Sequence, residues 1–230
     1  MDTDPSGARE IGRFRSKRNR VTLIDMEWDG FIIPVVMKEY PAAEAAEREC
    51  CLLRRLDSLN INVPCVYKAQ GNVLYLQYIK GILLTEIIDN VSAYPTAWID
   101  GLAGWYYSLH RATIKENGAV MLKDDANLRN FIFLDNSFYA IDFEDEIYGR
   151  PEQDIAECCA YILSNDPSFT GGKFQVVNKF IDAYCRQDRA AHKEVVREDI
   201  KRSLKNIAGY RKQQSGDIIN SLPLVDFFVS

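Results

Sequence analysis

The sequence predicts an α+β protein with two lobes, a small β-rich lobe and a larger, mainly helical one. Strand-like runs and one amphipathic helix fill residues 1–78. A short connector follows at residues 79–82, and residues 83–230 are mainly helical, interrupted by a single hairpin with polar ends. Strands that precede helices along the chain are typical of the α+β class, in which the two kinds of element segregate.

Size and composition limit the classes of function. The chain has 230 residues, of which 47% are hydrophobic and 27% charged, so a globular fold with a real core is expected. The net charge of −5 provides no general attraction to nucleic acid. No apolar run approaches the roughly 18 residues of a membrane span, and the first residues (MDTDPSGARE) are too polar for a signal peptide. We therefore expect a cytoplasmic protein without a transmembrane segment.

The six cysteines indicate thiols, and neither disulfides nor zinc ligands. They occur as two adjacent pairs and two single residues: Cys50–Cys51, Cys158–Cys159, Cys65 and Cys185. Adjacent residues of a helix point in different directions and are poor disulfide partners. No CxxC spacing suggests zinc. Buried thiols in a reducing cytoplasm are the expectation.

The first strands form a predicted hairpin. Residues 21–28 and 31–39 are rich in β-branched and apolar residues, and Asp29-Gly30 between them is a strong two-residue turn signal. Pro34 cannot donate to a strand ladder, so it indicates an edge position or a bulge.

One helix and a second pair of strands complete the small lobe. Residues 42–59 have helical composition, with Ala46, Glu49, Leu53 and Leu56 on one face. Strand-like runs follow at 65–69 and 73–79, around Gly71-Asn72. 

The larger lobe is predicted from helical periodicity. Helices are expected at 83–90, 95–111, 151–164, 173–185 and 189–213, with Pro95 in the first turn of the second. The aromatic residues of that helix are expected in the core: Trp98, Trp105, Tyr106 and Tyr107. His110 is interpreted as a core or capping residue, and His192 as a surface residue.

Three polar residues flank an apolar hairpin in the larger lobe. Asp125 and Asn130 are five residues apart, and two apolar runs (FIFL and FYAI) then lead to Asp142. Because a hairpin returns the chain to its start, Asn130 and Asp142 can lie side by side. Carboxylate and amide oxygens suit Mg²⁺, which also takes phosphate oxygens. Asp125 could accept a proton from an attacking hydroxyl. The alternative is a capped surface hairpin.

Lys38 and Glu49 form a second candidate pair. Lys38 ends an apolar strand, and Glu49 lies on the apolar face of the next helix. A carboxylate in that position is desolvated and needs a cation. Glu44 and Glu47 are rival partners, but Glu49 shares its face with Leu53. The alternative is two unrelated surface charges.

Together these residues resemble the protein-kinase-like superfamily: a strand lysine, a helix glutamate, D-x-x-x-x-N and then I-D-F. The resemblance covers about residues 21–163. The stretch "IDFED…YGRPEQDIAE" is similar to aminoglycoside phosphotransferases and choline kinases. The short chain also resembles lipopolysaccharide kinases and the small atypical kinase of the tRNA-threonylcarbamoylation complex. A two-lobed protein-kinase-like fold is therefore implied, with an N-lobe at 1–78, a hinge at 79–82 and a C-lobe at 83–230.

The resemblance implies a role for each motif residue, with ATP and Mg²⁺ as cofactors. Lys38 would hold the α- and β-phosphates, and Glu49 would orient Lys38. Asp125 would be the catalytic base, with Asn130 and Asp142 as metal ligands. The backbone of Leu76, Gln77 and Tyr78 would meet adenine. Asp154 would brace the catalytic loop from below.

The catalytic loop departs from the family pattern. The histidine two residues before the base is replaced by Lys123. Asn127 stands where protein kinases often have a lysine, so Lys123 or Arg129 would have to supply a charge near the γ-phosphate. Asp124 is a rival to Asp125, six residues from Asn130 instead of five.

The glycine-rich loop of the family is also missing. The stretch GRFRSKRNRV holds one glycine, Gly12, within a basic segment from Arg9 to Arg20. Its arginine and lysine side chains could bind phosphate in place of backbone amides. The alternatives are a solvated edge, or a patch for RNA or anionic lipid headgroups.

The function that these observations favour is ATP- and Mg²⁺-dependent phosphotransfer to a hydroxyl of an unidentified acceptor. No A-P-E segment or long activation loop follows Asp142, which favours a small-molecule acceptor over a protein. A non-catalytic nucleotide-binding or scaffold protein on the same fold is the first alternative, and an RNA-associated atypical serine/threonine kinase is the second.

Overall fold

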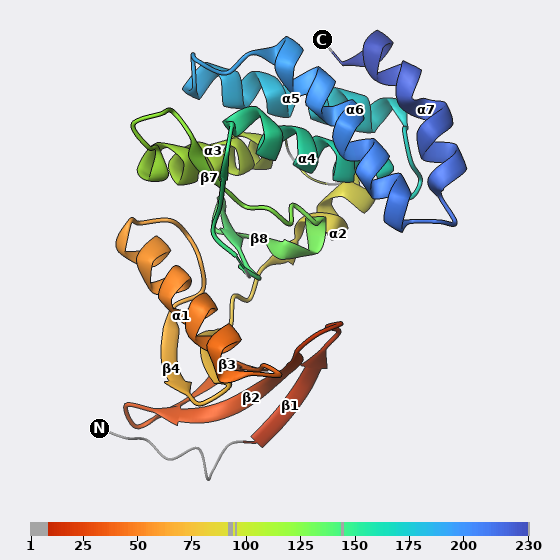
Figure 1. Ribbon diagram of the computed structural model, residues 1–230. Coiled ribbons are helices and arrows are strands. Elements are labelled where there is room, and N and C mark those ends of the chain that lie inside the picture. The colour runs from red at the N-terminus through yellow and green to blue at the C-terminus, as the bar shows by residue number, and fades with distance from the viewer. Residues whose placement is uncertain (1–8, 92–93, 95, 144, 230) are drawn as a thin grey trace. The chain divides into compact units, whose positions relative to one another are not determined.

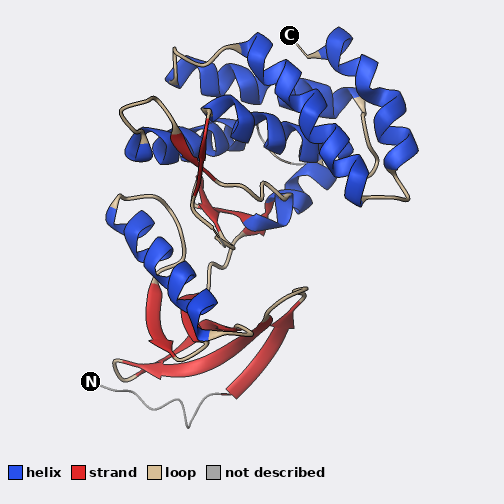
Figure 2. Cartoon of the chain, viewed as in Figure 1, coloured by secondary structure: helices blue, strands red, loops and turns tan. Residues whose placement is uncertain are grey.

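A computed structural model describes residues 9–91, 94, 96–143 and 145–229 of the chain. The chain forms two compact units. The first contains the residues up to Lys80 together with Phe143 and Asp145, and the second contains Gly81–Asp142 and Glu146 onward. Strands dominate the first unit and helices the second, as the sequence predicts (Figure 2).

The first unit is built on a five-stranded antiparallel sheet. Its strands lie in the order β1-β2-β3-β5-β4. Their bounds are Arg9–Phe14 (β1), Arg20–Trp28 (β2), Phe31–Glu39 (β3), Val66–Gln70 (β4) and Val73–Gln77 (β5). The predicted strands are confirmed, and β1 is an addition. It pairs with β2, with a register shift between Glu10 and Gly12.

The β2–β3 hairpin turns at the predicted dipeptide. Asp29 and Gly30 both have positive φ, 50° and 80°, which a tight two-residue hairpin turn requires and which glycine adopts freely. Pro34 lies opposite Asp25 of β2, but β5 pairs with β3 only from Val35 onward. Pro34 therefore occupies a locally unpaired edge of an interior strand, which leaves room for its missing N–H.

Helix α1 (Ala43–Ser58) buries the face predicted for it. Figure 1 shows this helix running alongside the sheet. Lys38 is directly opposite Val21 and Leu74 in the ladder, and cross-strand partners share a face of the sheet. Since Lys38 bonds to Glu49 of α1, this is the face that α1 covers. The other face carries a separate apolar cluster that contains Ile24, Met26, Val35 and Tyr75.

The second unit is a set of packed helices (Figure 1). Their bounds are Leu84–Asp89 (α2), Ala97–Thr113 (α3), Pro151–Ser164 (α4), Gly171–Gln187 (α5), Lys193–Tyr210 (α6) and Ser215–Phe228 (α7). Helix α3 packs against α5, and α4 packs against α6. Pro95, which was placed in the first turn of α3, lies outside the described residues. Helix α6 begins at Lys193, later than the predicted residue 189, because Asp188 accepts the Ala190 N–H in a turn before it.

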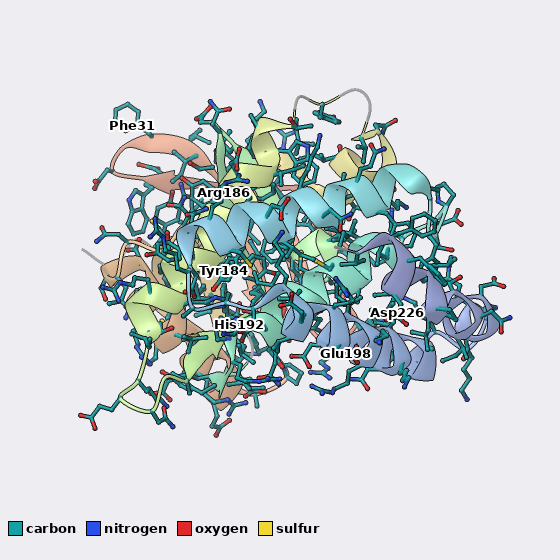
Figure 3. All side chains as sticks on the ribbon, turned by 90° about the horizontal axis from the view of Figure 1, so that it is seen from above. Phe31, Tyr184, Arg186, His192, Glu198 and Asp226 are labelled. Carbon is teal, nitrogen blue, oxygen red and sulfur yellow. The ribbon has the colours of Figure 1, made fainter. Side chains whose placement is uncertain are left out.

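Helix α7 was not predicted, because Pro223 argues against a helix interior. It nonetheless forms, burying Ile218 and Val225. Lys201 of α6 lies 2.7 Å from Glu198 and 2.9 Å from Asp226 of α7, and both acids are labelled in Figure 3. Packing on α6 therefore outweighs the proline.

Short strands hold the central segment of the second unit. Strands β8 (Phe131–Leu134) and β9 (Ser137–Ala140) form the predicted hairpin, and β6 (Ile82–Leu83) extends it. Asp135 and Asn136 at its turn have φ of 50° and 61°, as in the first hairpin. A second ladder joins β7 (Val120–Leu122) to β10 (Ile147–Gly149), which the sequence did not indicate. This ladder ties the segments before and after the candidate catalytic residues.

The expected core is largely present. Trp98, Trp105 and Tyr106 of α3 are buried, and Tyr107 is half-buried. The six cysteines are free. The expectation of buried thiols holds for Cys50, Cys158 and Cys159, whereas Cys65 and Cys185 are half-buried and Cys51 is exposed on the outer face of α1. Within the described residues, no helix has both the length and the apolar character needed to cross a membrane.

Candidate active site

Lys38 and Glu49 form a buried ion pair in the first unit. Nζ of Lys38 lies 2.9 and 2.7 Å from the two carboxylate oxygens of Glu49, and the Tyr40 hydroxyl donates to the same carboxylate at 2.7 Å. Lys38 is 6% exposed and Glu49 is 2% exposed, whereas the rivals Glu44 and Glu47 lie on the exposed face of α1. The predicted pairing is therefore correct. Removing one partner of a buried pair of this kind destabilises the folded protein by about 3–5 kcal/mol, because the other charge is left buried and uncompensated.

Asp125 and Asn130 are joined in the second unit by the loop between them. Nδ2 of Asn130 donates to Oδ2 of Asp125 at 3.0 Å and to its carbonyl at 3.3 Å. The Asn127 N–H donates to Oδ1 of Asp125 at 3.2 Å. Both carboxylate oxygens of Asp125 are thus oriented by donors, while the residue itself stays exposed. This arrangement favours Asp125 over Asp124 as the residue matched to Asn130.

Lys123 joins the two ends of the site. Its side chain is buried, and Nζ donates to the carbonyl of Asp125 at 3.2 Å and to that of Asp142 at 3.1 Å. Asp142 has a φ of 62°, a left-handed conformation that aspartate tolerates better than most residues. The Ile141 N–H donates to the carbonyl of Asn130 at 2.9 Å, so Asn130 and Asp142 lie at the same end of the hairpin. Lys123 is therefore a loop organiser, and the expectation that its charge could serve a γ-phosphate is not favoured.

Asp154 supports the loop from α4. Its Oδ2 accepts the Lys123 N–H at 2.8 Å and lies 3.1 Å from Nε2 of His110. The other ring nitrogen of His110 is 2.7 Å from the Tyr184 hydroxyl. The Tyr184 hydroxyl in turn donates to Oδ2 of Asp188 at 3.2 Å. His110 thus fixes Asp154 from within the core, where the sequence placed it without indicating this role.

The donor set at Asn130 and Asp142 fits a hard cation. Because Nδ2 of Asn130 is committed to Asp125, its Oδ1 is the atom left to face a metal. No cluster of three or more His, Cys, Asp or Glu side chains that could hold a metal occurs in the part of the chain that the structure describes. Mg²⁺ needs no such cluster, since it binds one or two protein oxygens together with phosphates and water.

Glu157 is a titratable neighbour of this loop that the sequence reasoning missed. It lies on α4, and its carboxyl pKa is raised to about 8 by burial first, and then by the charges of Asp154, Asp124 and Asp125. Lys123 opposes the shift. Residues three and four apart share a helix face, so Asp154, Glu157 and Tyr161 all face the same way. The spacing of these three residues in the stretch PEQDIAECCAY is the sequence signal that could have identified Glu157.

The three residues expected to meet adenine occupy different positions. Leu76 and Gln77 lie inside β5, where the Gln77 N–H donates to the carbonyl of Cys65 at 2.9 Å. Tyr78 follows the strand, and its ring lies 6.3 Å from that of Phe14. Of the three, Tyr78 is the residue whose backbone lies beyond the ladder.

The basic segment forms the β1–β2 hairpin. Arg13 and Arg20 lie 2.8 and 3.9 Å from the carboxylate of Glu10, so these two charges are partly compensated. The exposed loop between the two strands carries Arg15, Lys17 and Arg18. It occupies the position at which the family resemblance implies a glycine-rich loop.

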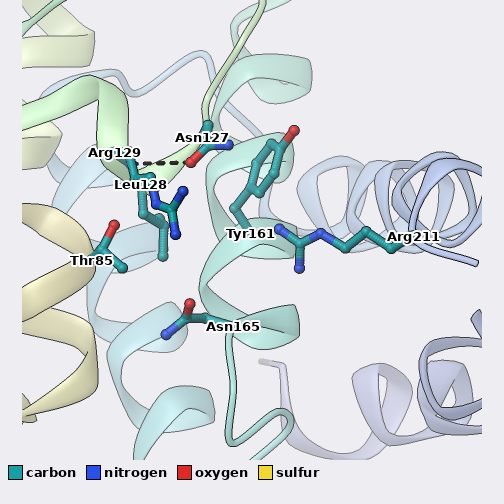
Figure 4. Close-up of a pocket in the computed structure, with 7 residues that line it drawn as sticks. All are labelled: Thr85, Asn127, Leu128, Arg129, Tyr161, Asn165 and Arg211. Atoms are coloured by element: carbon teal, nitrogen blue, oxygen red, sulfur yellow. Dashed lines mark hydrogen bonds between the residues drawn. The ribbon is translucent and has the colours of Figure 1, made fainter. Parts of the chain in front are cut away.

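A cavity of about 190 Å³ lies beside the candidate catalytic loop, within the second unit. It is lined by Asn127 and Arg129 of the loop, Thr85 of α2, Tyr161 of α4, and Arg211 after α6 (Figure 4). Arg129 was a candidate from the sequence. Arg211 was not, and no local pattern marks it, because it is about eighty residues away in the chain.

Comparison with known proteins connects this geometry to kinases. No family model matches the chain. The chain is 31% identical over 110 residues to the EKC/KEOPS complex subunit BUD32 of Encephalitozoon cuniculi, which covers 48% of this chain and 51% of that protein. The chain thus matches about half the length of this curated relative.

Solved structures match over nearly the whole chain. An ADP-bound aminoglycoside phosphotransferase, APH(2'')-Ib, has a TM-score of 0.66 at 15% identity, covering 98% of this chain and 96% of that one. The amicoumacin kinase hAmiN, solved in complex with AMP-PNP, Ca²⁺ and Ami, has a TM-score of 0.67 at 13% identity, covering 96% of this chain and 87% of that one. Plasmodium vivax ethanolamine kinase has a TM-score of 0.64 at 12% identity, covering 95% and 81%. These likenesses establish the fold.

Proposed function

We propose that this chain, which has the protein-kinase-like fold, is an ATP- and Mg²⁺-dependent phosphotransferase that acts on a hydroxyl of a small molecule. The observation that carries the proposal is the bonded set in the second unit. Lys123 binds the carbonyls of both Asp125 and Asp142, and Asn130 binds the carboxylate of Asp125. A scaffold has no need to hold a base and two metal-ligand candidates in one network.

Each candidate residue has a role that its geometry permits. Asp125, exposed and oriented by two donors, would accept the proton of the attacking hydroxyl. Asn130 and Asp142 would hold Mg²⁺, which supplies positive charge to the phosphates when it is bound. Lys38, kept in place by Glu49, would neutralise the nucleotide phosphates. Phosphoryl transfer depends mainly on such positioning and charge stabilisation.

The named relatives support a small-molecule acceptor, since ethanolamine kinase and the aminoglycoside and amicoumacin enzymes modify small molecules by name. The likeness of half the chain to a KEOPS complex subunit supports a second candidate, an atypical kinase that works within an RNA-associated assembly. The basic β1–β2 loop would then contact RNA. Binding of tRNA that falls steeply with salt would favour that second candidate.

Phosphate transfer by paired loop variants tests the proposal. Asp125→Ala should lower the single-turnover rate by about 10²–10⁴-fold, the usual cost of losing a general base. The affinity for ATP–Mg²⁺ should change little, because the base touches the acceptor. Asp124→Ala is the matched control and should cost far less, since it is Asp125 that contacts Asn130. Slow ATP hydrolysis serves as the readout until an acceptor is found.

Two results would contradict the proposal. A larger loss for Asp124→Ala than for Asp125→Ala would move the base by one residue. Wild-type rates in both variants, or the absence of any ATP turnover in the wild-type chain, would assign the protein to the non-catalytic class.

A further inference from the structure

The cavity beside the catalytic loop is rich in hydrogen-bond donors. Arg129 and Arg211 direct their guanidinium groups toward the same space from two sides (Figure 4). The side-chain oxygen of Asn127 accepts the Arg129 N–H at 3.1 Å, so Nδ2 of Asn127 is its remaining group. Oγ1 of Thr85 is buried and has no hydrogen-bond partner within the described residues. All four side chains can therefore donate to a ligand.

Neither guanidinium group has a carboxylate partner in the part of the chain that the structure describes. Arg211 donates only to neutral oxygens: the Ser164 carbonyl at 3.1 Å, its hydroxyl at 3.3 Å and Gln214 at 3.5 Å. It also lies over the ring of Tyr161 at 5.5 Å. Through these contacts Arg211 is held in place while its charge stays uncompensated. The backbone N–H of Arg129 donates to Oδ1 of Asn127, and its side chain makes no hydrogen bond or ion pair with any residue that the structure describes.

The cavity wall is held in position by a buried lysine. Lys173 is 3% exposed, and its Nζ donates to the carbonyls of Asn165 and Pro167 at 2.6 and 2.8 Å. Nδ2 of Asn165 is committed to Asp89 at 2.6 Å. Asp89 is thus already bonded to this wall, and Lys173 holds the wall without a ligand.

The cavity is connected to the candidate base through Asn127, which lines it. The Asn127 N–H donates to Oδ1 of Asp125 at 3.2 Å. Asn127 and Arg129 are themselves part of the loop from Asp125 to Asn130. A molecule anchored in the cavity would therefore lie beside Asp125.

We propose that this cavity binds the acidic group of the acceptor, a phosphate or carboxylate, while a hydroxyl of the same molecule reaches Asp125. The assignment rests on the proposed phosphotransferase function and narrows its acceptor to an anionic alcohol. Guanidinium groups bind such anions through paired, charge-assisted hydrogen bonds. The solved enzymes of similar fold are named for ethanolamine and aminoglycosides, which carry amino groups, and two uncompensated arginines would repel such a cation.

Calorimetric titration without nucleotide tests this site at constant ionic strength. The probes are inorganic phosphate, glycerol 3-phosphate, glycerate, glycerol and ethanolamine. The anions should bind the wild-type chain, whereas glycerol and ethanolamine should not. Binding of glycerol 3-phosphate alone would assign the site to phosphate, and binding of glycerate alone would assign it to carboxylate; either supports the proposal.

Arginine variants separate this cavity from other anion sites on the chain. Arg129→Gln and Arg211→Gln should each weaken the binding of the anion at least about tenfold, which is the effect of losing one charge-assisted hydrogen bond. Arg186→Gln is the matched control, because Arg186 is exposed and paired with Asp100 at 2.9 Å. If Arg211→Gln does not fold, Arg129→Gln still tests the proposal. The Arg129 side chain makes no hydrogen bond or ion pair among the described residues, so its replacement should leave the fold intact.

Anion affinity that is unchanged in both cavity variants, or ethanolamine binding that exceeds glycerate binding, would overturn the proposal. The outcome is independent of the proposed activity, because no ATP is present. Loss of ATP turnover with anion binding intact would refute the activity and leave the cavity assignment standing.

Discussion

Lys123 shows how one residue can replace a family feature with different chemistry. The resemblance implies a histidine at this position, where this chain has a lysine. The ammonium group instead donates to the carbonyls of Asp125 and Asp142 from a buried position. A side chain with three donors can bind two segments at once. The loop is thus organised by a lysine.

We expect Lys123→Met to lower kcat by on the order of 10²-fold, since small displacements of a catalytic group have effects of this size. KM for ATP should rise as well, because Lys123 positions Asp142, a candidate metal ligand, together with Asp125. Stability should fall by about 1–3 kcal/mol as two carbonyls lose their donor. Steady-state kinetics and urea unfolding measure both effects.

Lys205→Met is the control, since Lys205 is an exposed lysine of α6. Lys123→His, which restores the residue that the resemblance implies, should recover part of kcat. If Lys123→Met is less stable than the wild type but keeps the wild-type kcat, Lys123 contributes to folding and not to catalysis.

Glu157 predicts a pH dependence of stability. Its pKa is raised to about 8 in the folded chain, above its ordinary value of 4.5. Between these values the folded chain holds a proton that the unfolded chain has released, so stability from this group falls as pH rises. The stability of Glu157→Gln relative to wild type should therefore increase from pH 5 to 8 and level off above it.

Urea unfolding at pH 5, 6, 7, 8 and 9 measures this difference. Glu194→Gln, at an exposed position of α6, provides the control. A difference between Glu157→Gln and wild type that stays constant across this range would show that Glu157 titrates normally.

At the scale of elements, the β1–β2 hairpin is a phosphate-binding candidate without glycines. Its loop presents Arg15, Lys17 and Arg18 to solvent. If these side chains contact the β- and γ-phosphates, each alanine variant should raise KM for ATP severalfold, by about 1 kcal/mol or more of lost charge-assisted bonding. AMP binding should be unaffected, because AMP lacks those phosphates.

Arg13→Ala is the control within the same hairpin, because Arg13 is engaged with Glu10. Equal weakening of ATP and AMP, or no change in either, would assign the loop to another partner or to solvent.

At the scale of the whole molecule, nucleotide binding should raise the thermal stability of the folded chain. A ligand that binds only the folded state raises the melting temperature by mass action. We therefore expect ATP or ADP with Mg²⁺ to stabilise the chain, and Asp142→Asn to remove mainly the metal-dependent part. Asparagine adopts the left-handed conformation of residue 142 as readily as aspartate, so the substitution preserves the backbone. Thermal unfolding with and without EDTA makes the measurement.

No shift at millimolar nucleotide, with or without metal, would rule out nucleotide binding. An unchanged metal dependence in Asp142→Asn would give Asp142 a structural role.

The sequence by itself determined the features that local periodicity encodes. Turn dipeptides marked both predicted hairpins of the five-stranded sheet. The D-x-x-x-x-N segment led into a third predicted hairpin. The Lys38–Glu49 pair was predicted from an acid on an apolar helix face, because a desolvated charge needs a partner wherever the chain places it. These signals need only a few neighbouring residues.

Only the tertiary structure decided the contacts between distant segments. It buried Lys123 between two loops, placed His110 against Asp154, and brought Arg211 to the cavity of Arg129. It also formed α7 despite Pro223 and paired the three-residue strands β7 and β10. The physical reason is that burial and long-range bonding set the energy of each of these features, and neither quantity is carried by the residues adjacent in sequence.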